Sequence, residues 1–398
     1  MNNNSIILFD KIPKEFKKHE KVSVLQYEIS GIQGFIFGGV TISSTRRIIA
    51  KRSEYIVHIT DVMEEWLREN LSRFSRFRVL SKSSGKLICA VSHRVKQDKL
   101  YDLSNQLQRI IYASTDGKLE MFYGICDAVV VEGSEWNQNQ NAMSVLAEEV
   151  NRNKYHCINL LGFDHKKYRL DEYMLNASVT TEDDEVIKSN NIMVAVKFDL
   201  DNLGSFFLKL NAFDTRKAAS ERLAEILNEA LEEDAGIYPI FVGGDDIFAI
   251  ADIDNYLKVV SDLHERIKEK IGASDELLLY KDYFGISGGA SFIRNDLGTV
   301  PLVYYFEQSE DSLMRAKDLP DKNSFVVSNY VLTWEQLKTL SNILSKNGAI
   351  ITQGLGEQQI YNLYLNIKEL KSRILRLNKN TGKTLLTSKE EEDVYSIN

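Results

Sequence analysis

In the second half of the chain, short apolar runs alternate with longer segments whose apolar residues recur at helical spacing. Residues 194–199 and 283–292 have the composition of buried strands, whereas residues 219–230 and 256–271 carry the apolar stripe of a helix. Residues 237–251 form two apolar runs separated by Gly-Gly-Asp-Asp, which indicates a hairpin. This order of strand, helix, hairpin, helix and strand predicts a ferredoxin-like palm domain, an antiparallel sheet with helices on one face.

The first half of the chain repeats the pattern in three blocks that occur in the same order. "VSVLQYEISGIQGFIF" (22–37) matches "MVAVKFDLDNLGSFFL" (193–208), "SSGKLICAV" (83–91) matches "VGGDDIFAI" (242–250), and "MFYGICDAVV" (121–130) matches "DYFGISGGAS" (282–291). The sequence therefore predicts an α+β protein with two palm domains.

The pattern also predicts where the parts of the chain begin and end. We expect a first palm domain at 1–165, a polar linker at 166–191, a second palm domain with the Gly-Gly-Asp-Asp hairpin at 192–330, and a helical region at 331–398. The last part, 378–398, is polar, and we expect it to be a frayed tail.

Composition narrows the class of protein further. The 398 residues are 43% hydrophobic with a net charge of -8, which disfavours broad nonspecific binding to nucleic acid. No apolar stretch has the length of a membrane span, so we expect a cytoplasmic protein. The three cysteines are too widely spaced for a zinc site, and we expect buried thiols. The basic segments 14–21, 45–52 and 368–379 are interpreted as solvated helix faces rather than phosphate contacts.

Three carboxylates are the candidate metal ligands. In the palm order the end of the first strand lies beside the turn of the central hairpin, so Asp199 approaches Asp245 and Asp246. Converging carboxylates are costly unless a cation lies among them, and hard oxygen ligands favour Mg²⁺ or Mn²⁺ over zinc. The backbone carbonyl of Leu200 is a further candidate ligand. Asp201 is either a ligand or a helix cap, and the cap is the favoured interpretation.

Several nearby residues are suited to bind a nucleotide. The glycines allow a close approach to the backbone, a helix start offers N–H groups to a triphosphate, and a lysine can reach its β- or γ-phosphate. These residues are Gly243, Gly244, Asn202, Leu203, Gly204 and Lys317.

The first copy has lost this carboxylate cluster. Aligning Gly85 with Gly244 puts Lys86 and Leu87 at the positions of Asp245 and Asp246, and only Glu28 remains.

The motifs "EISGIQGFIF", "FDLDNLGSFF", "VGGDDIFAI" and "RAKDLPDKNSFVVSNYVLTWEQL" together make the sequence similar to the Cas-ten family. This is the large, Csm/Cmr-type subunit of type III CRISPR effector complexes, whose two palm domains are related to GGDEF cyclases. The resemblance, over about residues 20–345, implies a Mg²⁺-dependent nucleotidyltransferase that converts ATP into 3′-5′ linked cyclic oligoadenylate, a second messenger of antiviral defence. It makes Asp199, Asp245 and Asp246 the catalytic metal ligands. It also implies that the first palm domain holds a second ATP, with Gly85 and Lys86 as the candidate residues for its phosphates. It also implies guide RNA and target RNA as partners through other subunits, or a homo-oligomer if the chain acts alone.

Two departures from the family limit what the resemblance implies. The sequence has no His-Asp dipeptide and no zinc-binding cysteine cluster, so neither an HD nuclease domain nor zinc is expected. Two alternatives to the synthetase stay open: a non-catalytic palm scaffold that binds RNA and protein subunits, and, ranked lower, a diguanylate cyclase.

Overall fold

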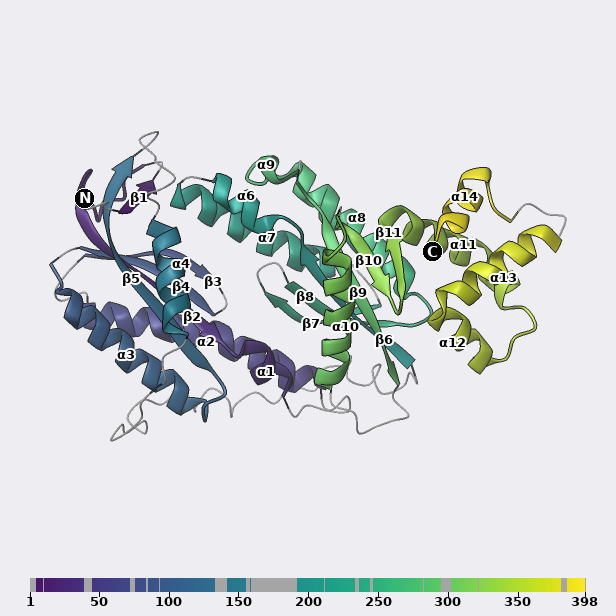
Figure 1. Cartoon of the computed structure of the whole chain (residues 1–398), viewed down its shortest axis with the longest axis horizontal. Helices are drawn as coiled ribbons and strands as arrows, with labels where there is room; N and C mark the ends of the chain where they lie inside the picture. The colour runs from purple at the N-terminus through teal and green to yellow at the C-terminus, as the bar shows by residue number, and fades with distance from the viewer. Residues whose placement is uncertain are drawn as a thin grey trace. The chain divides into compact units, whose positions relative to one another are not determined.

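The computed structural model divides the chain into two compact units, each built around one β-sheet (Figure 1). The described residues are 5–9, 11–38, 45–71, 76–83, 85–92, 94–132, 142–154, 158, 192–210, 212–232, 236–243, 246–281, 283–294, 302–320, 322–380 and 385–397. The predicted linker at 166–191 lies outside them, and so do Gly244 and Asp245. Within these ranges, no helix has the length and apolar character needed to cross a membrane.

The first unit contains a mixed sheet with helices on both faces. Its described elements are β1 (Ser5–Phe9), β2 (Lys21–Ser30), α1 (Ile32–Phe37), α2 (Thr45–Leu71), β3 (Phe77–Ser83), β4 (Lys86–Ser92), α3 (Gln97–Ser114), β5 (Glu120–Glu132) and α4 (Ala142–Asn153). The strand order is β1-β5-β2-β4-β3, and all pairs are antiparallel except β1 with β5.

The two faces of this sheet are covered by different helices because side chains alternate along each strand. On one face, Val22 and Val24 of β2 belong to a buried core with Leu146 of α4. On the other face, the Tyr27 hydroxyl lies 2.9 Å from Ser104 Oγ of α3. Glu28 follows at the end of β2 on the α4 face, which places the only retained carboxylate of the first copy under that helix.

The second unit has a six-stranded mixed sheet. The elements of this part of the chain up to the last strand are β6 (Ile192–Leu200), α6 (Leu203–Lys209), α7 (Phe213–Glu232), β7 (Ile237–Gly243), β8 (Asp246–Asp252), α8 (Tyr256–Ala273), α9 (Leu278–Lys281), β9 (Ile286–Arg294), α10 (Leu302–Lys317), β10 (Ser324–Val327) and β11 (Tyr330–Thr333). Residues 207–221, within α6 and α7, belong to the first unit. The strand order is β11-β10-β9-β6-β8-β7, with β10 parallel to β9. The predicted strands, helices and hairpin of this unit are confirmed, whereas the prediction of a purely antiparallel sheet is wrong because β10 is parallel to β9.

Helix α10 lies close against one face of the second sheet. Gly289 of β9 makes this possible, because a Cβ there would lie 2.5 Å from the Ser309 carbonyl oxygen and would clash with the backbone of Leu313. On the opposite face, the ring of Phe292 meets that of Tyr256 from α8, with centroids 6.0 Å apart. The prediction that helices cover one face only is therefore wrong.

The two units repeat the same strand register at the candidate site. Glu28 pairs with Lys86 across β2 and β4, and Asp199 pairs with Asp246 across β6 and β8. Each neighbouring hairpin has an irregularity at the same distance from that pair, between Val79 and Ser81 in one and between Pro239 and Phe241 in the other.

This register corrects two of the three sequence alignments. The match of residues 22–37 with 193–208 is consistent with the strand pairing. Lys86, however, corresponds to Asp246 and not to Asp245, a shift of one residue. Gly124 pairs with Gln26, and Gly289 pairs with Lys197, so Gly124 corresponds to Gly289 rather than to Gly285. Single-sequence alignment missed both shifts because the matched letters are mostly apolar strand residues, whose pattern does not fix the register.

The C-terminal region is helical, as predicted, after β11. It contains α11 (Trp334–Thr352), α12 (Glu357–Leu365), α13 (Ile367–Asn380) and α14 (Ser388–Ser396). The prediction of a frayed tail is wrong for α14, which begins with a capping box between Thr387 and Glu390 and buries Val394. A short helix with few apolar residues gives little periodicity, so its polar composition concealed it.

Two of the basic segments have structural uses that the sequence did not reveal. Lys371 of α13 donates to the Tyr395 carbonyl oxygen at 3.0 Å, and Arg373 donates to that of Gln353 at 2.8 Å. Arg52 of α2 donates to the carbonyl oxygens of Phe35 and Gly38, at 3.0 and 2.7 Å. These side chains satisfy carbonyl groups at helix ends, where no intrahelical partner exists.

Candidate functional site

The candidate site lies at the end of β6, where two predicted carboxylates meet. Asp199 is directly opposite Asp246 in the β6/β8 register, so their side chains point to the same face. The Asp199 side chain is 12% exposed and that of Asp246 is 30% exposed. Gly243 ends β7 opposite Asp246, and the two residues between them, Gly244 and Asp245, lie outside the described residues. The structure thus brings together two of the three predicted ligands.

Lys317 approaches this carboxylate pair from the last turn of α10. Its Nζ lies 2.7 Å from Asp199 Oδ1, and its side chain is 28% exposed. The apolar residues of α10 face the sheet, as the sequence predicts, with Leu313 and Ala316 buried. The helix therefore holds the ammonium group of Lys317 at the edge of the site, where it contacts Asp199 and solvent.

A second lysine, which sequence reasoning missed, lies beside Asp246. Lys197 is 2% exposed, and its Nζ is 3.8 Å from Asp246 Oδ1. The same ammonium group is ion-paired with Glu310 of α10 and lies 4.6 Å from the centroid of the Phe306 ring. The available signal was a lone lysine inside an otherwise apolar strand, two residues before Asp199 and on the same face.

Asp201 is neither a helix cap nor positioned as a ligand in this structure. It is 2% exposed, and its carboxylate accepts hydrogen bonds from Ser287 Oγ at 2.9 Å and from the Asn323 amide at 3.0 Å. Its own amide donates to the Gly285 carbonyl oxygen at 2.8 Å. The predicted cap is wrong because these partners lie at the start of β9 and before β10, away from the start of α6. Asp201 joins the end of β6 to both segments.

The three residues predicted to offer backbone N–H groups lie in the turn after Asp201 and at the start of α6. Asn202 has a positive φ of 60°, and its side-chain amide donates to the Tyr283 carbonyl oxygen at 3.3 Å. Leu203 is 7% exposed and anchors the start of α6. Gly204 has no atom within 4 Å of the place where a Cβ would be. The space beside Gly204 is therefore open. Leu200 ends β6 and pairs with Ile286.

The corresponding place in the first unit is occupied by a carboxylate between two lysines. Lys86 Nζ lies 2.9 Å from Glu28 Oε1, and Lys154 Nζ lies 3.8 Å from Glu28 Oε2. Gln26 donates to Glu28 at 2.8 Å. Burial acts to raise the pKa of Glu28, but the charges of Lys86 and Lys154 and the hydrogen bonds from Lys86 and Gln26 outweigh it and hold that pKa below its usual value.

Lys154 is a further residue that sequence reasoning missed. It directly follows α4 and contacts Glu28, just as Lys317 ends α10 and contacts Asp199. Both units therefore keep an acid-lysine contact between the central strand and the helix above it.

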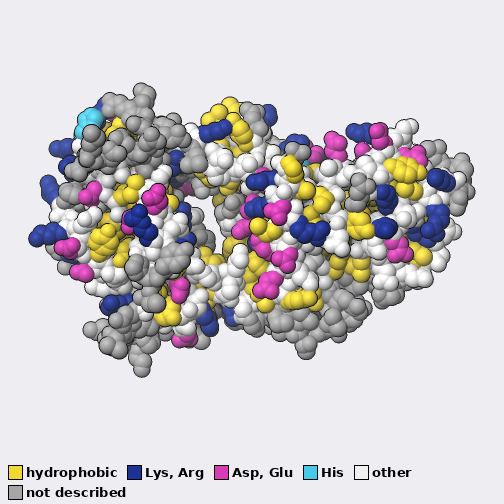
Figure 2. Space-filling model, viewed as in Figure 1, with side chains coloured by type: hydrophobic (Ala, Val, Ile, Leu, Met, Phe, Trp, Pro, Cys, Tyr) yellow, Lys and Arg dark blue, Asp and Glu magenta, His cyan; other side chains and the backbone are white. Residues whose placement is uncertain are grey.

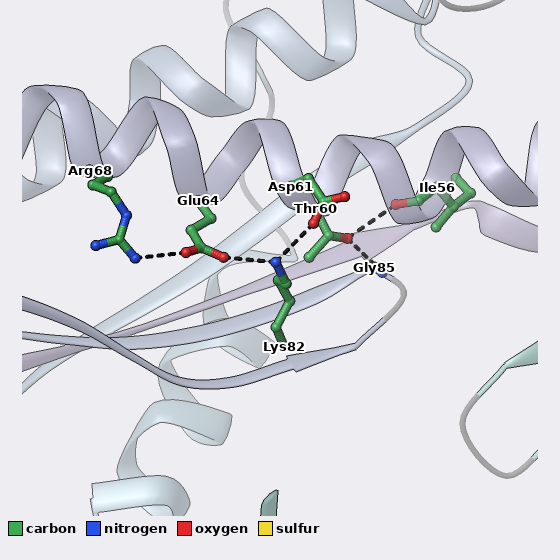
Figure 3. A network of polar contacts seen from close by, with 7 residues as sticks. All are labelled: Ile56, Thr60, Asp61, Glu64, Arg68, Lys82 and Gly85. Carbon is green, nitrogen blue, oxygen red and sulfur yellow. Dashed lines mark hydrogen bonds and ion pairs between the residues drawn. The ribbon is translucent and has the colours of Figure 1, made fainter. Parts of the chain in front are cut away.

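Gly85 has a structural role at the β3–β4 turn. It has a φ of +78°, its amide donates to Thr60 Oγ1 of α2 at 3.0 Å, and Thr60 donates in turn to the Ile56 carbonyl oxygen (Figure 3). Lys82 ties the same hairpin to α2 through ion pairs with Asp61 and Glu64, both at 2.8 Å. A Cβ at Gly85 would lie 2.6 Å from Ile32 Cδ1. The Gly85 N–H is therefore already used within the protein.

The donor atoms at Asp199 and Asp246 fit a hard divalent cation. Both carboxylates reach solvent and share one face, and carboxylate oxygen is the ligand that Mg²⁺ and Mn²⁺ prefer. Among the described residues, no three acidic, His or Cys side chains are grouped closely enough to hold a metal ion. Asp245, the third predicted ligand, lies outside that description.

The described residues form a two-unit α+β protein whose two sheets share the same strand register at the candidate site. In the second sheet this position carries the opposed carboxylates Asp199 and Asp246, with Lys317 in contact with Asp199. Family models match both units: Cas10/Cmr2, second palm domain, over residues 193–326, and Csm1 subunit domain B over residues 21–164. The chain is a Cas10/Csm1-like subunit. The predicted resemblance is thereby confirmed.

Solved structures show the same fold over most of the chain. The Csm1–Csm4 cassette in complex with cA4 matches with a TM-score of 0.61 at 13% identity, covering 93% of this chain and 65% of that one. Csm1 of T. onnurineus matches with a TM-score of 0.61 at 15% identity, covering 93% and 65%. The Csm1–Csm4 subcomplex of the type III-A CRISPR-Csm interference complex matches with a TM-score of 0.60 at 15% identity, covering 94% and 68%.

This chain therefore spans about 65% of the length of the first of these relatives. No curated protein matches it.

Proposed function

We propose that this chain is a nucleotidyltransferase that converts ATP into cyclic oligoadenylate in type III CRISPR-type antiviral defence. The observation that carries the proposal is the opposition of Asp199 and Asp246 across β6 and β8, with Lys317 against Asp199. The fold relatives support it, because Csm1–Csm4 cassettes have been solved with cA4, with AMPPNP and with pppApA.

In this proposal both units are ferredoxin-like, GGDEF-related palm domains, and only the second is catalytic. The order β5-β2-β4-β3 and the order β9-β6-β8-β7 are the same arrangement. The first unit has Lys86 where the second has Asp246, so it holds a nucleotide without assembling a metal site. Lys86 and Lys154 then offer positive charge to that nucleotide's phosphates.

Asp199, Asp246 and the neighbouring Asp245 would hold Mg²⁺ or Mn²⁺, with the Leu200 carbonyl as a further ligand. Bound there, the ion would lower the pKa of an attacking ribose hydroxyl and offset the charge of the leaving pyrophosphate. The chain itself supplies the carboxylate pair on one face, and Lys317 offers its ammonium group to the β- or γ-phosphate. Gly243, Gly244 and the backbone N–H groups of Asn202, Leu203 and Gly204 would bind the triphosphate, and the space beside Gly204 is open.

The partners follow from the same proposal. Guide RNA and target RNA would act through other subunits, and a Csm4-like protein is a candidate because Csm1 relatives have been solved with Csm4. If the chain works alone, a homo-oligomer is the alternative. The place of action would be the cytoplasm.

One observation favours a second candidate, a non-catalytic scaffold. Each described carboxylate of the site faces a lysine, Asp199 with Lys317 and Asp246 with Lys197. Their charges are partly offset without a metal, so their presence does not by itself require one. A diguanylate cyclase is retained as the lower alternative because no residue of the described site selects the base.

The test is to incubate the purified chain with each labelled NTP and Mg²⁺, with and without RNA, and to resolve the products by mass spectrometry. Asp199→Asn and Asp246→Asn keep the side-chain shape and remove the charge. Asp262→Asn, on α8, is the matched control, because that carboxylate pairs only with the exposed Lys258 in the contacts described.

Cyclic oligoadenylate made by the native chain and by the control, and lost in both site variants, is the expected result. A product from GTP alone would point to the cyclase. No product with any nucleotide or RNA, together with no binding of Mg-ATP, would establish the scaffold.

A further inference from the structure

Lys197 is a buried cation in the middle of a sheet. An ammonium group removed from water costs several kcal/mol, on the order of a whole domain's margin of stability, unless it is paired. Here the pairing comes from α10, where Glu310 binds the ammonium and the Phe306 ring lies 4.6 Å away. Helix α10 can reach Lys197 because Gly289, the residue paired with Lys197 in the sheet, has no side chain to keep it away.

The ammonium group is also directed at the site. Its Nζ is 3.8 Å from Asp246 Oδ1, while Glu310 and Asp246 have side chains 32% and 30% exposed. In Figure 2 acidic side chains gather over the part of the second unit where α10 lies. Lys197 is thus a nearly inaccessible cation between two accessible acids.

The first unit shows that the fold does not require this lysine. The carbonyl of Leu146 lies over Gly124 as that of Ser309 lies over Gly289, so the two helices can be aligned residue by residue. At the positions of Lys197 and Glu310 the first unit has Gln26 and Ala147. Both units nevertheless keep the sheet, the covering helix and the glycine between them.

The residues at these two positions differ between the units in step with the charge of a third position, which is Lys86 in the first unit and Asp246 in the second. Where the second unit has Asp246, the first has Lys86, and a lysine in place of Gln26 would lie near that like charge. The buried lysine and its acidic anchor occur only in the unit that has the aspartate. This points to a role for Lys197 tied to Asp246 rather than to the stability of the sheet.

We propose that Lys197 is a positioning residue: anchored by Glu310 and Phe306, it holds the Asp246 carboxylate opposite Asp199 in the arrangement that binds a divalent cation. This inference rests on the metal site of the proposed function but not on the identity of the nucleotide or product. A fixed carboxylate loses less freedom when a cation binds, so the tether favours binding.

Variants of Lys197 and Glu310 distinguish a positioning role from an effect of net charge and from a packing role. Lys197→Met removes the tether and one positive charge. The double variant Lys197→Met/Glu310→Gln removes the tether but leaves the net charge unchanged. Glu310→Gln alone loosens the anchor at a partly exposed position, so it remains informative if Lys197→Met does not fold. Lys270→Met, which removes a 3.0 Å ion pair with Glu229 on α7, is the matched control.

The readout is a titration of each folded variant of the full chain with Mn²⁺ alone, followed by the EPR signal of the free ion. The Asp246→Asn variant defines background binding. We expect both Lys197→Met and the double variant to weaken the Asp246-dependent binding at least about 5-fold, Glu310→Gln to weaken it by about 2-fold or more, and Lys270→Met to leave it unchanged.

Three results would overturn the proposal. Native affinity in the double variant would mean that only net charge matters. Native affinity in all the variants would mean that Lys197 is a packing residue. If the native chain bound no more Mn²⁺ than Asp246→Asn, Asp246 would not be a cation ligand and Lys197 could not position it for that purpose. A native chain that binds Mn²⁺ but neither makes product with any nucleotide or RNA nor binds Mg-ATP would instead reject the proposed function and leave the role of Lys197 to be judged by the titration.

Discussion

Lys86 in the first unit holds the position that Asp246 holds in the second, each directly opposite the acid at the end of the central strand. A lysine at this position gives the first unit a neutralised Glu28–Lys86 ion pair, whereas an aspartate there gives the second unit two opposed acids. The two sites differ in chemistry although the strands that build them share a register.

Replacing Lys86 should change how the stability of the first unit depends on pH. The pKa of Glu28 is held below its usual value in the folded chain, so its contribution is present above the unfolded value of about 4.5 and is lost as pH falls through the folded pKa. In Lys86→Met, Glu28 loses the ion pair and hydrogen bond from Lys86, while the effect of burial, which raises its pKa, remains. We expect the melting temperature to drop by roughly 2–4 °C at pH 7, with a difference that shrinks below about pH 4.

Differential scanning calorimetry at several pH values checks this, with Lys118→Met as the control because that side chain is exposed. An equal loss at every pH would show that Lys86 acts through packing rather than through Glu28.

Lys317 should matter for the reaction more than for the fold. Its ammonium group contacts Asp199 and is 28% exposed, so Lys317→Ala removes a charge from the site without opening a core cavity. We expect product formation to slow by about 10²-fold, the order of one lost electrostatic contact in a transition state. Lys317→Arg should recover part of the rate. Equal rates in the native chain and Lys317→Ala would exclude a phosphate contact.

Gly289 should tolerate no side chain. Because a Cβ there would meet the backbone of α10, Gly289→Ala should lower the free energy of unfolding by at least about 2 kcal/mol. Gly348, in α11, has open space around it, and Gly348→Ala should stabilise the helix by roughly 0.5–1 kcal/mol. Urea denaturation of both variants tests the pair of expectations, and the same sign of change in both would contradict them.

His264 should make the second unit less stable in mild acid. Burial lowers its pKa to about 4, although Glu265, 3.5 Å from Nδ1, opposes this, while Lys268 and Lys338 add to the lowering. Between about pH 6.5 and pH 4 only the unfolded chain binds this proton, so stability falls as the pH decreases through that window.

The histidine ring stacks on Trp334 with centroids 4.1 Å apart, and His264→Phe keeps that contact. The variant should have a flatter melting temperature between pH 4.5 and 7 than the native chain. Identical slopes would assign the acid sensitivity to other groups.

The sequence predicted most of what depends on local pattern. The strands, the helix over 256–271 and the hairpin are confirmed because each has its own periodicity or turn residues. The acid pair was predictable because palm order brings the end of one strand to the hairpin turn, and Asp199 does pair with Asp246.

The predictions that failed concern contacts between residues that are far apart in the sequence. The edge strand β1 joins β5 from the far end of its unit, and its pairing leaves no local signal. Asp201 was assigned to a neighbouring helix, whereas its partners Ser287 and Asn323 are 86 and 122 residues away. The role of Lys197 is not predictable from the sequence because its partner Glu310 is 113 residues away and lies on α10.

Helix α10 carries Lys317, which contacts Asp199, and Glu310, which contacts Asp246 only through Lys197 of β6. Its backbone is set against Gly289 so closely that it has little room to tilt toward the sheet. A displacement along its own axis would instead move both contacts together. Such a movement would take Lys317 from Asp199 and Glu310 from Lys197 together, so one helix links the surroundings of both carboxylates.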